Sequence, residues 1–491
     1  MSTLLRRVKS EGLLRKRVRS VADAVPIVLA LALCSGVIAS FVRLPLVEHP
    51  AMGWSEVLVA DAKALASGYF IYADPSRHYV GAHYSPLFTF VHAGLMRLYW
   101  WEGWGALISM TCVGVAVFAL ARTLSRGARL SRNALAQMAT LVAFTLSSFT
   151  LIGVNGVFEA RADQMAWALF VIAAVRILDD LSALEPRSLK RRALTGVILA
   201  LSILTKQTTL PSCLAAAGIA GCVGFFSARQ RASAAPTWKE QWLELSALVL
   251  VVALALGILQ LVSGGYAFDL LIELPQRHFR LLELDQGLEI AARALLVPSS
   301  IALLVLAAHA AAWVLRRRSA PATPLFGEPR KLLLVSAAFA LLLATLSGGV
   351  LAITKQGASA NQLIGCVWAL ALVLVAIFLG SETAERRWTA YVIAGVLVLC
   401  SIGPLADLAA DHDIATPGFV LDKAWQELPA ELVKANEKGK NVFDWEYPSL
   451  SFVEGSAKPP GLVTFCDMAA GGYSPRWFIR NILRGEYDMV R

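Results

Sequence analysis

The sequence predicts an all-α polytopic membrane protein, and three observations lead to that fold class. The chain has 491 residues, of which 57% are hydrophobic and only 16% charged, and its mean hydropathy is +0.60. Soluble domains contain about 45–50% apolar and about 25% charged residues. Continuous apolar stretches, without the alternation of barrel strands, recur at lengths that suit about 30 Å of hydrocarbon. We expect about 11 to 13 transmembrane helices, together with outer-face juxtamembrane helices.

The predicted spans are continuous apolar stretches separated by polar segments. They lie near 23–42, 104–121, 135–152, 164–178, 194–205, 210–226, 243–263, 290–315, 331–352, 362–380 and 388–407. The stretch 86–100 is also apolar, but a full crossing there would place the basic segment 122–132 outside. Either 86–100 lies in the outer interface or dips into it, or one later span is assigned wrongly. We favour about eleven full crossings and leave 86–100 open between these alternatives.

Positive charge predicts the orientation of the chain in the membrane. Residues 2–20 hold seven basic side chains and one acidic side chain, which places the N-terminus in the cytoplasm. Further basic loops between the spans are expected on the same side, at 122–132, 187–192, 229–231, 316–318 and 386–387. The net charge of +10 therefore reflects topology, and no nucleic-acid partner is predicted. Without a small-residue cleavage site, the first span is expected to be an anchor, in a bacterial plasma (inner) membrane.

This topology divides the chain into three predicted domains. Residues 1–22 form a basic cytoplasmic segment, and 23–407 form the transmembrane domain, with 43–103 as its first outer loop. Residues 408–491 lack a span and are expected to form a small α+β domain on the outer face. Helices are expected at 423–437 and 475–485, and a strand or two within 441–453.

Several classes of chemistry lack a sequence signal. Six of the seven cysteines lie in apolar runs, and no CxxC or Cys/His pair predicts a zinc site or a disulfide framework. The chain contains no P-loop, GxSxG or HExxH motif, so ATP-driven transport, serine hydrolysis and zinc proteolysis have no support. No cofactor is predicted from the residues.

The segment 53–68 predicts a helix at the membrane surface that carries two candidate carboxylates. Ser55 is placed to cap its N-terminus and Gly68 to end it. Glu56 falls in its first turn, where it is either a general base or a charge that favours a helix N-terminus. Asp61 either contacts substrate or lies on a solvated helix face.

The following segment, 69–86, concentrates aromatic, histidine and arginine side chains. His83 and Tyr84 are candidate ligands for a sugar or a phosphate, since aromatic faces and hydroxyls suit sugars and cations suit phosphates. The alternative interpretation is an ordinary interfacial aromatic belt.

Two later outer turns add further candidates. Glu159, Arg161 and Asp163 lie between two spans, as an ion pair at a helix entry or as groups brought towards Glu56. Lys206 and Gln207 lie between two short apolar runs, where the lysine either reaches the headgroups or meets a substrate phosphate.

The longest late outer loop, 264–289, carries three more basic or titratable candidates: Arg277, His278 and Arg280. A mobile loop with cations above a membrane-level pocket is suited to clamp a lipid phosphate. A solvated connector with a surface helix is the alternative.

Three stretches of short motifs follow one another along the chain, and all of them are expected on the outer face. Glu56 is followed by A-x-x-L-x-x-G at 62–68, Y-x-D-P at 72–75 and Y-x-P at 84–86, then by R-x-D ending at Asp163 and by Lys206 with its polar neighbours. Together they resemble the GT-C superfamily of membrane glycosyltransferases, and in particular its protein-mannosyltransferase-like and aminoarabinose-transferase-like members. The resemblance covers about the first 210 residues.

The resemblance implies an inverting transferase that uses a polyprenyl-phosphate-linked sugar as donor and a glycan, lipid or protein as acceptor. It assigns the general base to Glu56 and the second-loop acid to Asp163, and makes Lys206, Arg277, His278 and Arg280 phosphate contacts. Many members have two adjacent acids where this chain has Ser55-Glu56. The resemblance therefore leaves a divalent cation open as a cofactor. The active face is expected to be extracytoplasmic.

Two other function classes stay open at this point. A transporter or flippase for a lipid-linked or polyprenyl-linked substrate should place ionisable residues in mid-span, with repeated halves or broken helices. Here the polar groups gather at span ends. A non-catalytic assembly scaffold would tolerate loss of Glu56, whereas an enzyme would not.

Overall fold

The computed structural model describes most of the membrane domain. Its described residues are 54–73, 85–125, 132–151, 160–183, 188–230, 242–273, 329–353 and 360–380, with isolated positions in 24–38 and 288–307 and the pairs 442–443 and 489–490. The predicted span 388–407 and the predicted helices 423–437 and 475–485 lie outside the described residues.

Helices dominate this part of the chain, as predicted. The longer ones are α2 (Trp54–Ala66), α3 (Leu87–Leu98), α4 (Trp104–Ser125), α5 (Arg132–Leu151), α6 (Ala162–Ala183), α7 (Leu189–Thr205), α8 (Leu210–Gln230), α10 (Leu243–Val262), α14 (Pro329–Ile353) and α15 (Ile364–Gly380). Short helical turns complete them: η3 (Gln207–Thr209), α11 (Tyr266–Phe268), η4 (Asp269–Glu273) and η5 (Ala360–Leu363).

The membrane character of the fold is confirmed by three described helices, Trp104–Leu124, Leu243–Val262 and Leu332–Ile353, which are long and apolar enough to cross a bilayer. The outer surface of α10 is apolar, with Leu254 56% and Leu261 82% exposed. An apolar helix face that no protein covers is suited to lipid contact. The total of about 11 to 13 crossings stays a prediction.

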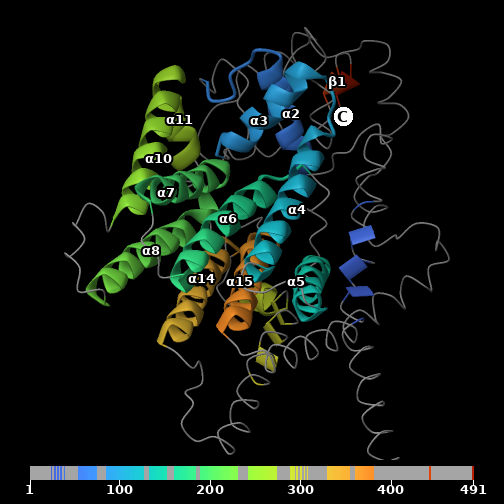
Figure 1. Cartoon of the computed structure of the whole chain (residues 1–491). Coiled ribbons are helices and arrows are strands. Elements are labelled where there is room, and N and C mark those ends of the chain that lie inside the picture. The colour runs from blue at the N-terminus through green and yellow to red at the C-terminus, as the bar shows by residue number, and fades with distance from the viewer. Residues whose placement is uncertain are drawn as a thin grey trace, which may run out of the picture.

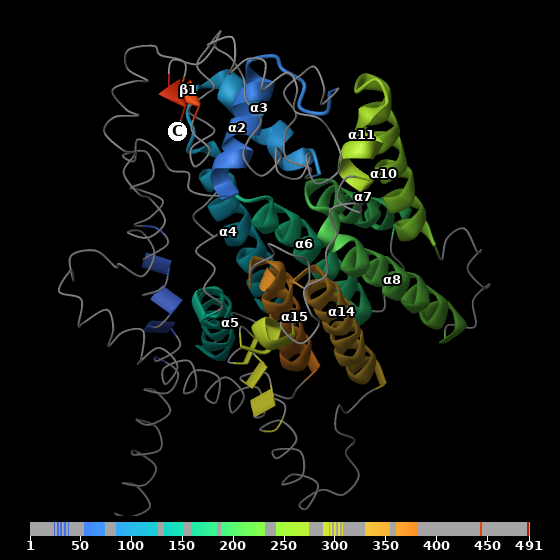
Figure 2. The same cartoon turned by 180° about the vertical axis from the view of Figure 1, so that it is seen from behind.

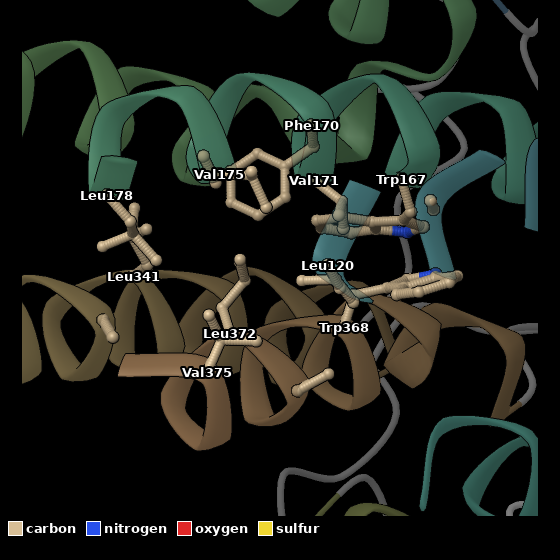
Figure 3. Packing of buried hydrophobic residues seen from close by; sticks show 14 of the residues in the cluster. Leu120, Trp167, Phe170, Val171, Val175, Leu178, Leu341, Trp368, Leu372 and Val375 are labelled. Carbon is tan, nitrogen blue, oxygen red and sulfur yellow. The ribbon is translucent and has the colours of Figure 1, made fainter. Parts of the chain in front are cut away.

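The core is centred on α15, which packs against α4, α5, α6 and α14. Figure 3 shows the indole rings of Trp167 on α6 and Trp368 on α15 lying one above the other, near Leu120 of α4. Gly365 allows this approach, because a Cβ atom at that position would lie 2.2 Å from the Trp167 ring. Within a bilayer the hydrophobic effect does not drive helices together. Small residues at helix contacts instead let the backbones come close enough for tight packing.

The helices that follow the first span collect at one end of the bundle. Figure 1 and Figure 2 place α2 and α3 above the start of α4, with α11 at the same end. Leu259, near the end of α10, packs with Ala60 of α2 and with Ala267 of α11. The structure thus brings α2, α3, the start of α6 and the α10–α11 corner together; that this end is the outer face stays a prediction.

The length of α3 answers the question posed by 86–100. The helix has 12 residues, and at 1.5 Å per residue it spans about 18 Å, too little for about 30 Å of hydrocarbon. It packs along α2. The prediction that this segment does not cross fully agrees with this geometry.

Two local expectations were wrong. The surface helix predicted at 53–68 is enclosed by protein, with every residue from Val57 to Ala64 buried, because α3 and the α10–α11 corner cover it. Ser55 is its second residue and not its N-cap, although Gly68 ends it with a left-handed φ of 91° as expected. The basic segment 187–192 is mostly helical, since α7 begins at Leu189 behind the N-cap Ser188.

The C-terminal region contributes one strand pair to the described residues. β1 (Val442–Phe443) lies within the predicted strand segment and pairs in parallel with β2 (Met489–Val490). The division of the chain into three domains stays a prediction.

Candidate functional site

The centre of the candidate site is a buried ion pair between α6 and the end of α7. Nζ of Lys206 lies 2.5 Å from Oδ1 of Asp163, and the two side chains are only 5% and 7% exposed. Asp163 lies in the first turn of α6, where the helix dipole favours a negative charge. The sequence predicted both residues but not that they pair.

The local sequence explains how Lys206 reaches α6. The residue ends α7 in an extended conformation, with φ −153° and ψ 118°, and η3 follows at once. Its carbonyl accepts hydrogen bonds from the backbone N–H and the hydroxyl of Thr209, at 3.1 and 2.9 Å. The hydroxyl of Ser202 donates to the Ala166 carbonyl at 2.8 Å and bonds the Thr209 hydroxyl at 3.2 Å. These buried hydroxyls fix the turn against α6.

Gln207, a predicted binding residue, has a structural partner. Its Oε1 accepts hydrogen bonds from the backbone N–H and the hydroxyl of Ser85, at 3.2 and 2.9 Å. Ser85 directly precedes the entry to α3. The contact therefore ties the end of the first predicted outer loop to the turn after α7, across 122 residues of sequence.

The segment that leads into α6 is anchored to α4. The Ser109 hydroxyl donates to the Arg161 carbonyl at 3.1 Å and lies 3.3 Å from the Arg161 backbone nitrogen. Ala160 and Ala162 share a hydrophobic cluster with Leu58 and Val59 of α2. The start of α6, with Asp163, is thereby held against α2.

Glu56 enters this arrangement through its backbone. It is the third residue of α2 and lies one helical turn before Val59, whose neighbours i−3 and i−4 share its face of the helix. Val59 packs with Ala160 and Ala162 at the start of α6, whereas the approach of Asp163 or Glu159 to Glu56 itself stays a prediction.

Asp61 is not on a solvated face. It is 1% exposed, and it lies close enough to Tyr72 to affect the titration of that phenol. Burial, and secondarily the Asp61 charge, raises the pKa of Tyr72 well above its ordinary value. Tyr72 therefore stays a neutral hydrogen-bonding group beside the carboxylate at any physiological pH.

Two buried polar residues, Lys63 of α2 and His92 of α3, and the partly buried Glu102 were missed by the sequence analysis. Lys63 pairs with Glu102, in the turn between α3 and α4, and His92 of α3 is 0% exposed beside them. Among the described residues, no hydrogen bond of ordinary geometry reaches either imidazole nitrogen of His92. Desolvation lowers the pKa of His92 to about 4, against an opposing effect of Glu102. The only sequence signal was a lone histidine in the apolar stretch 86–100, which is more often a packed core residue.

Most of the remaining predicted site residues are not described by the structure. The residues outside the described part of the chain are His83, Tyr84, Glu159, Arg277, His278 and Arg280. Arg161 is described and half-buried next to the ion pair. Among the described residues, no group of three or more His, Cys, Asp or Glu side chains is placed to hold a metal ion, and a divalent cation stays a prediction.

The arrangement is suited to acid–base and anion chemistry at a helix-bundle end. Carboxylates and cations meet there in a protein-enclosed environment, in which each charge acts more strongly than in water. The ammonium of Lys206 has three donors, and the bond to Asp163 uses one.

A similar arrangement of helices occurs in a protein whose crystal structure is known. Crystal structures of ArnT from Cupriavidus metallidurans, bound to undecaprenyl phosphate and in the apo state, match this chain with a TM-score of 0.50. The identity is 14%, over 91% of this chain and 76% of that chain. The chain has the fold of ArnT. No family model and no curated protein matches the sequence.

This likeness supports, at the level of the fold alone, the resemblance to aminoarabinose-transferase-like membrane proteins that was seen in the sequence. The ArnT-like fold also agrees with an all-α polytopic membrane protein. The ArnT crystallised with undecaprenyl phosphate shows that this fold accommodates a polyprenyl phosphate in that protein.

Proposed function

We propose that this chain is a membrane glycosyltransferase that moves a sugar from a polyprenyl-phosphate donor to an acceptor. The observation that carries the proposal is the buried Asp163–Lys206 pair at the bundle end that also holds α2. It stands in a fold shared with ArnT, a protein crystallised with undecaprenyl phosphate. We place this end on the extracytoplasmic face of a bacterial inner membrane, because the basic segments of the sequence favour the opposite face.

In the proposed mechanism Glu56 is the general base. The acceptor hydroxyl transfers its proton to the Glu56 carboxylate as its oxygen attacks the anomeric carbon of the donor. The bond between that carbon and the phosphate oxygen breaks, and the phosphate leaves with the electron pair. One direct displacement inverts the anomeric configuration.

Lys206 is proposed to stabilise the leaving phosphate, and Asp163 to orient Lys206. The two ammonium donors that are not directed at Asp163 suit an oxyanion on which charge develops. Because the pair is buried and braced by Ser202 and Thr209, the ammonium needs little reorganisation when the phosphate departs.

The alternative, a transporter or flippase, is less well supported by the same geometry. The two ionisable candidates on the predicted spans that the structure describes lie at helix ends: Asp163 in the first turn of α6 and Lys206 at the end of α7. A carrier with a midplane site is expected to have broken helices with ionisable groups in mid-span.

The test is sugar transfer by the purified full-length chain in lipid, with a mixed pool of polyprenyl-phosphate sugars and candidate acceptors. We expect Glu56→Gln to lower the rate at least about 100-fold, the range of a lost general base. Glu289→Gln is the control, since Glu289 is exposed and, among the described residues, pairs with Arg293 one turn away.

Lys206→Gln, whose amide can still donate to Asp163 but carries no charge, should lower transfer, and thermal unfolding measured beside the rate separates this loss from a loss of folded protein. Equal transfer by Glu56→Gln and wild type would move the base to Asp61 or Asp163. Binding of polyprenyl phosphate without transfer, with every acceptor class supplied, would favour the transporter.

A further inference from the structure

A pocket of about 300 Å³ lies between the end of α2 and one face of α3, outside the site described above. Leu65 comes from α2, Phe70 from the turn that follows it, and Phe90, Ala93 and Gly94 from α3. These side chains make the pocket apolar. Arg97, one turn beyond Ala93 on the same helix, supplies a charge at its edge.

The guanidinium of Arg97 is fixed in place but not neutralised. Its Nε and one Nη donate to the carbonyls of Ala66 and Leu65, at 3.3 and 3.1 Å. No carboxylate among the described residues pairs with it. Of five guanidinium donors, three are left for another acceptor.

Capping of α2 accounts for only part of this arrangement. The Leu65 carbonyl already accepts from the Gly68 N–H at 3.1 Å, and the Ala64 carbonyl from the Tyr69 N–H at 2.9 Å. This is the Schellman pattern, which satisfies the end of a helix by itself. A capping role therefore leaves both the positive charge and the adjoining apolar pocket without a partner.

The surface next to Arg97 has the composition of a membrane interface. Leu98, Tyr99 and Trp100 follow it directly and are 82%, 68% and 49% exposed. Tyrosine and tryptophan are enriched where the headgroups meet the hydrocarbon, and arginine beside them reaches the phosphate level. The pocket thus opens where a lipid, with its anionic head and apolar chains, is the neighbouring molecule.

We infer that this pocket binds an anionic glycerophospholipid of the surrounding bilayer. Its phosphate accepts from the free donors of Arg97, and the upper part of an acyl chain lies against Phe70, Phe90 and Leu65. The inference does not depend on the proposed transfer reaction. It concerns a bilayer lipid and not the polyprenyl-phosphate donor.

Gly94 offers a direct way to close the pocket. A Cβ atom at this position would meet no atom within 4 Å, so Gly94→Leu grows a side chain into the open space without a clash. Leucine is also a better helix former than glycine, so α3 should not suffer. Gly114→Leu on α4 is the matched control, because its Cβ likewise meets nothing within 4 Å and the position is exposed.

The experiment uses the full-length chain in phosphatidylcholine nanodiscs that contain a photoactivatable phosphatidylglycerol. After irradiation, labelling of peptides from residues 85–104 is quantified against a photoactivatable phosphatidylcholine. We expect preferential labelling by the anionic probe, its loss in Gly94→Leu and no change in Gly114→Leu. Arg97→Gln should lower labelling about fivefold, the effect of about one cation near a membrane surface, while Lys190→Gln, an exposed cation at the far end, should not.

Thermal unfolding of each variant in discs of phosphatidylcholine alone serves as the folding control. If Gly94→Leu is unstable, Phe90→Trp fills the same pocket from the next turn. Equal labelling by the two probes, or unchanged labelling in stable pocket-filled variants, would overturn the inference. So would displacement of the probe by polyprenyl phosphate at lower concentration than by phosphatidylglycerol, since the pocket would then hold the donor.

Discussion

The ammonium of Lys206 lies 2.5 Å from the Asp163 carboxylate, and the pair joins the end of α7 to the first turn of α6. Both groups are nearly excluded from solvent. Each therefore depends on the other for the stability of its charge, whatever further role the pair has in binding a phosphate.

Loss of Lys206 should consequently cost more than loss of an ordinary surface lysine. We predict that Lys206→Met destabilises the protein by about 3–5 kcal/mol, because it leaves the Asp163 charge buried and unpaired. The double variant Lys206→Met with Asp163→Leu should recover much of that loss. Thermal unfolding in detergent measures both, with exposed Lys190→Met as control. An unchanged melting temperature in the single variant would show that Asp163 finds another partner.

The burial of His92 predicts that the folded state loses stability in acid. Its folded pKa is about 4, lowered from 6.5 by burial, so the unfolded chain binds a proton at mildly acidic pH that the folded chain does not. Stability should be complete above about pH 6.5 and should fall as the pH drops towards 4, by up to about 3 kcal/mol.

His92→Phe should remove this dependence, since a second ring beside Phe88 suits the apolar site. The measurement is the melting temperature across pH 4 to 7.5 for wild type and variant. Parallel pH profiles would show that other groups cause the acid sensitivity.

Gly365 tests the close packing of α6 on α15. We predict that Gly365→Ala lowers stability by about 1–3 kcal/mol, because its Cβ would lie 2.2 Å from the Trp167 ring. Gly218→Ala in α8 is the matched control, since its Cβ meets nothing within 4 Å; it should be neutral or stabilising. Equal melting temperatures for the two variants would mean that Trp167 moves aside at no cost.

The difference between what the sequence predicts and what it misses follows from the range of the interactions. Apolar runs depend on local composition, so the stretches around α4 to α8, α10, α14 and α15 were predicted close to their observed bounds. Asp163, Lys206 and Gln207 were selected for their unusual polarity. Their partners were not predicted, because Ser85 and Gln207 are 122 positions apart.

Which residues are buried was harder to predict from the sequence than where the helices lie. The amphipathic pattern of 53–68 is the same for a helix that rests on lipid and for one that other helices cover, and only the position of α3 and α11 decides between them. The Lys63–Glu102 pair was missed for this reason. A lysine on a predicted surface helix gives no sign that a carboxylate from another segment covers it.

The start of α7 provides a test of how this protein uses buried charge. Arg192 of α7 donates to both carboxylate oxygens of Glu244 on α10, at 2.7 and 2.6 Å, and Gly196 lets the helices approach there. We predict that Arg192→Met costs about 3–5 kcal/mol, whereas Arg192→Met with Glu244→Leu costs little, because only the single variant strands a buried charge.

Lys190→Met is the control for that experiment. It removes an exposed charge two residues before Arg192 and should cost no more than about 1 kcal/mol. Thermal unfolding of the three variants decides the matter. A double variant as unstable as the single one would mean that the two-point hydrogen bonding holds α7 against α10 and that apolar packing cannot replace it.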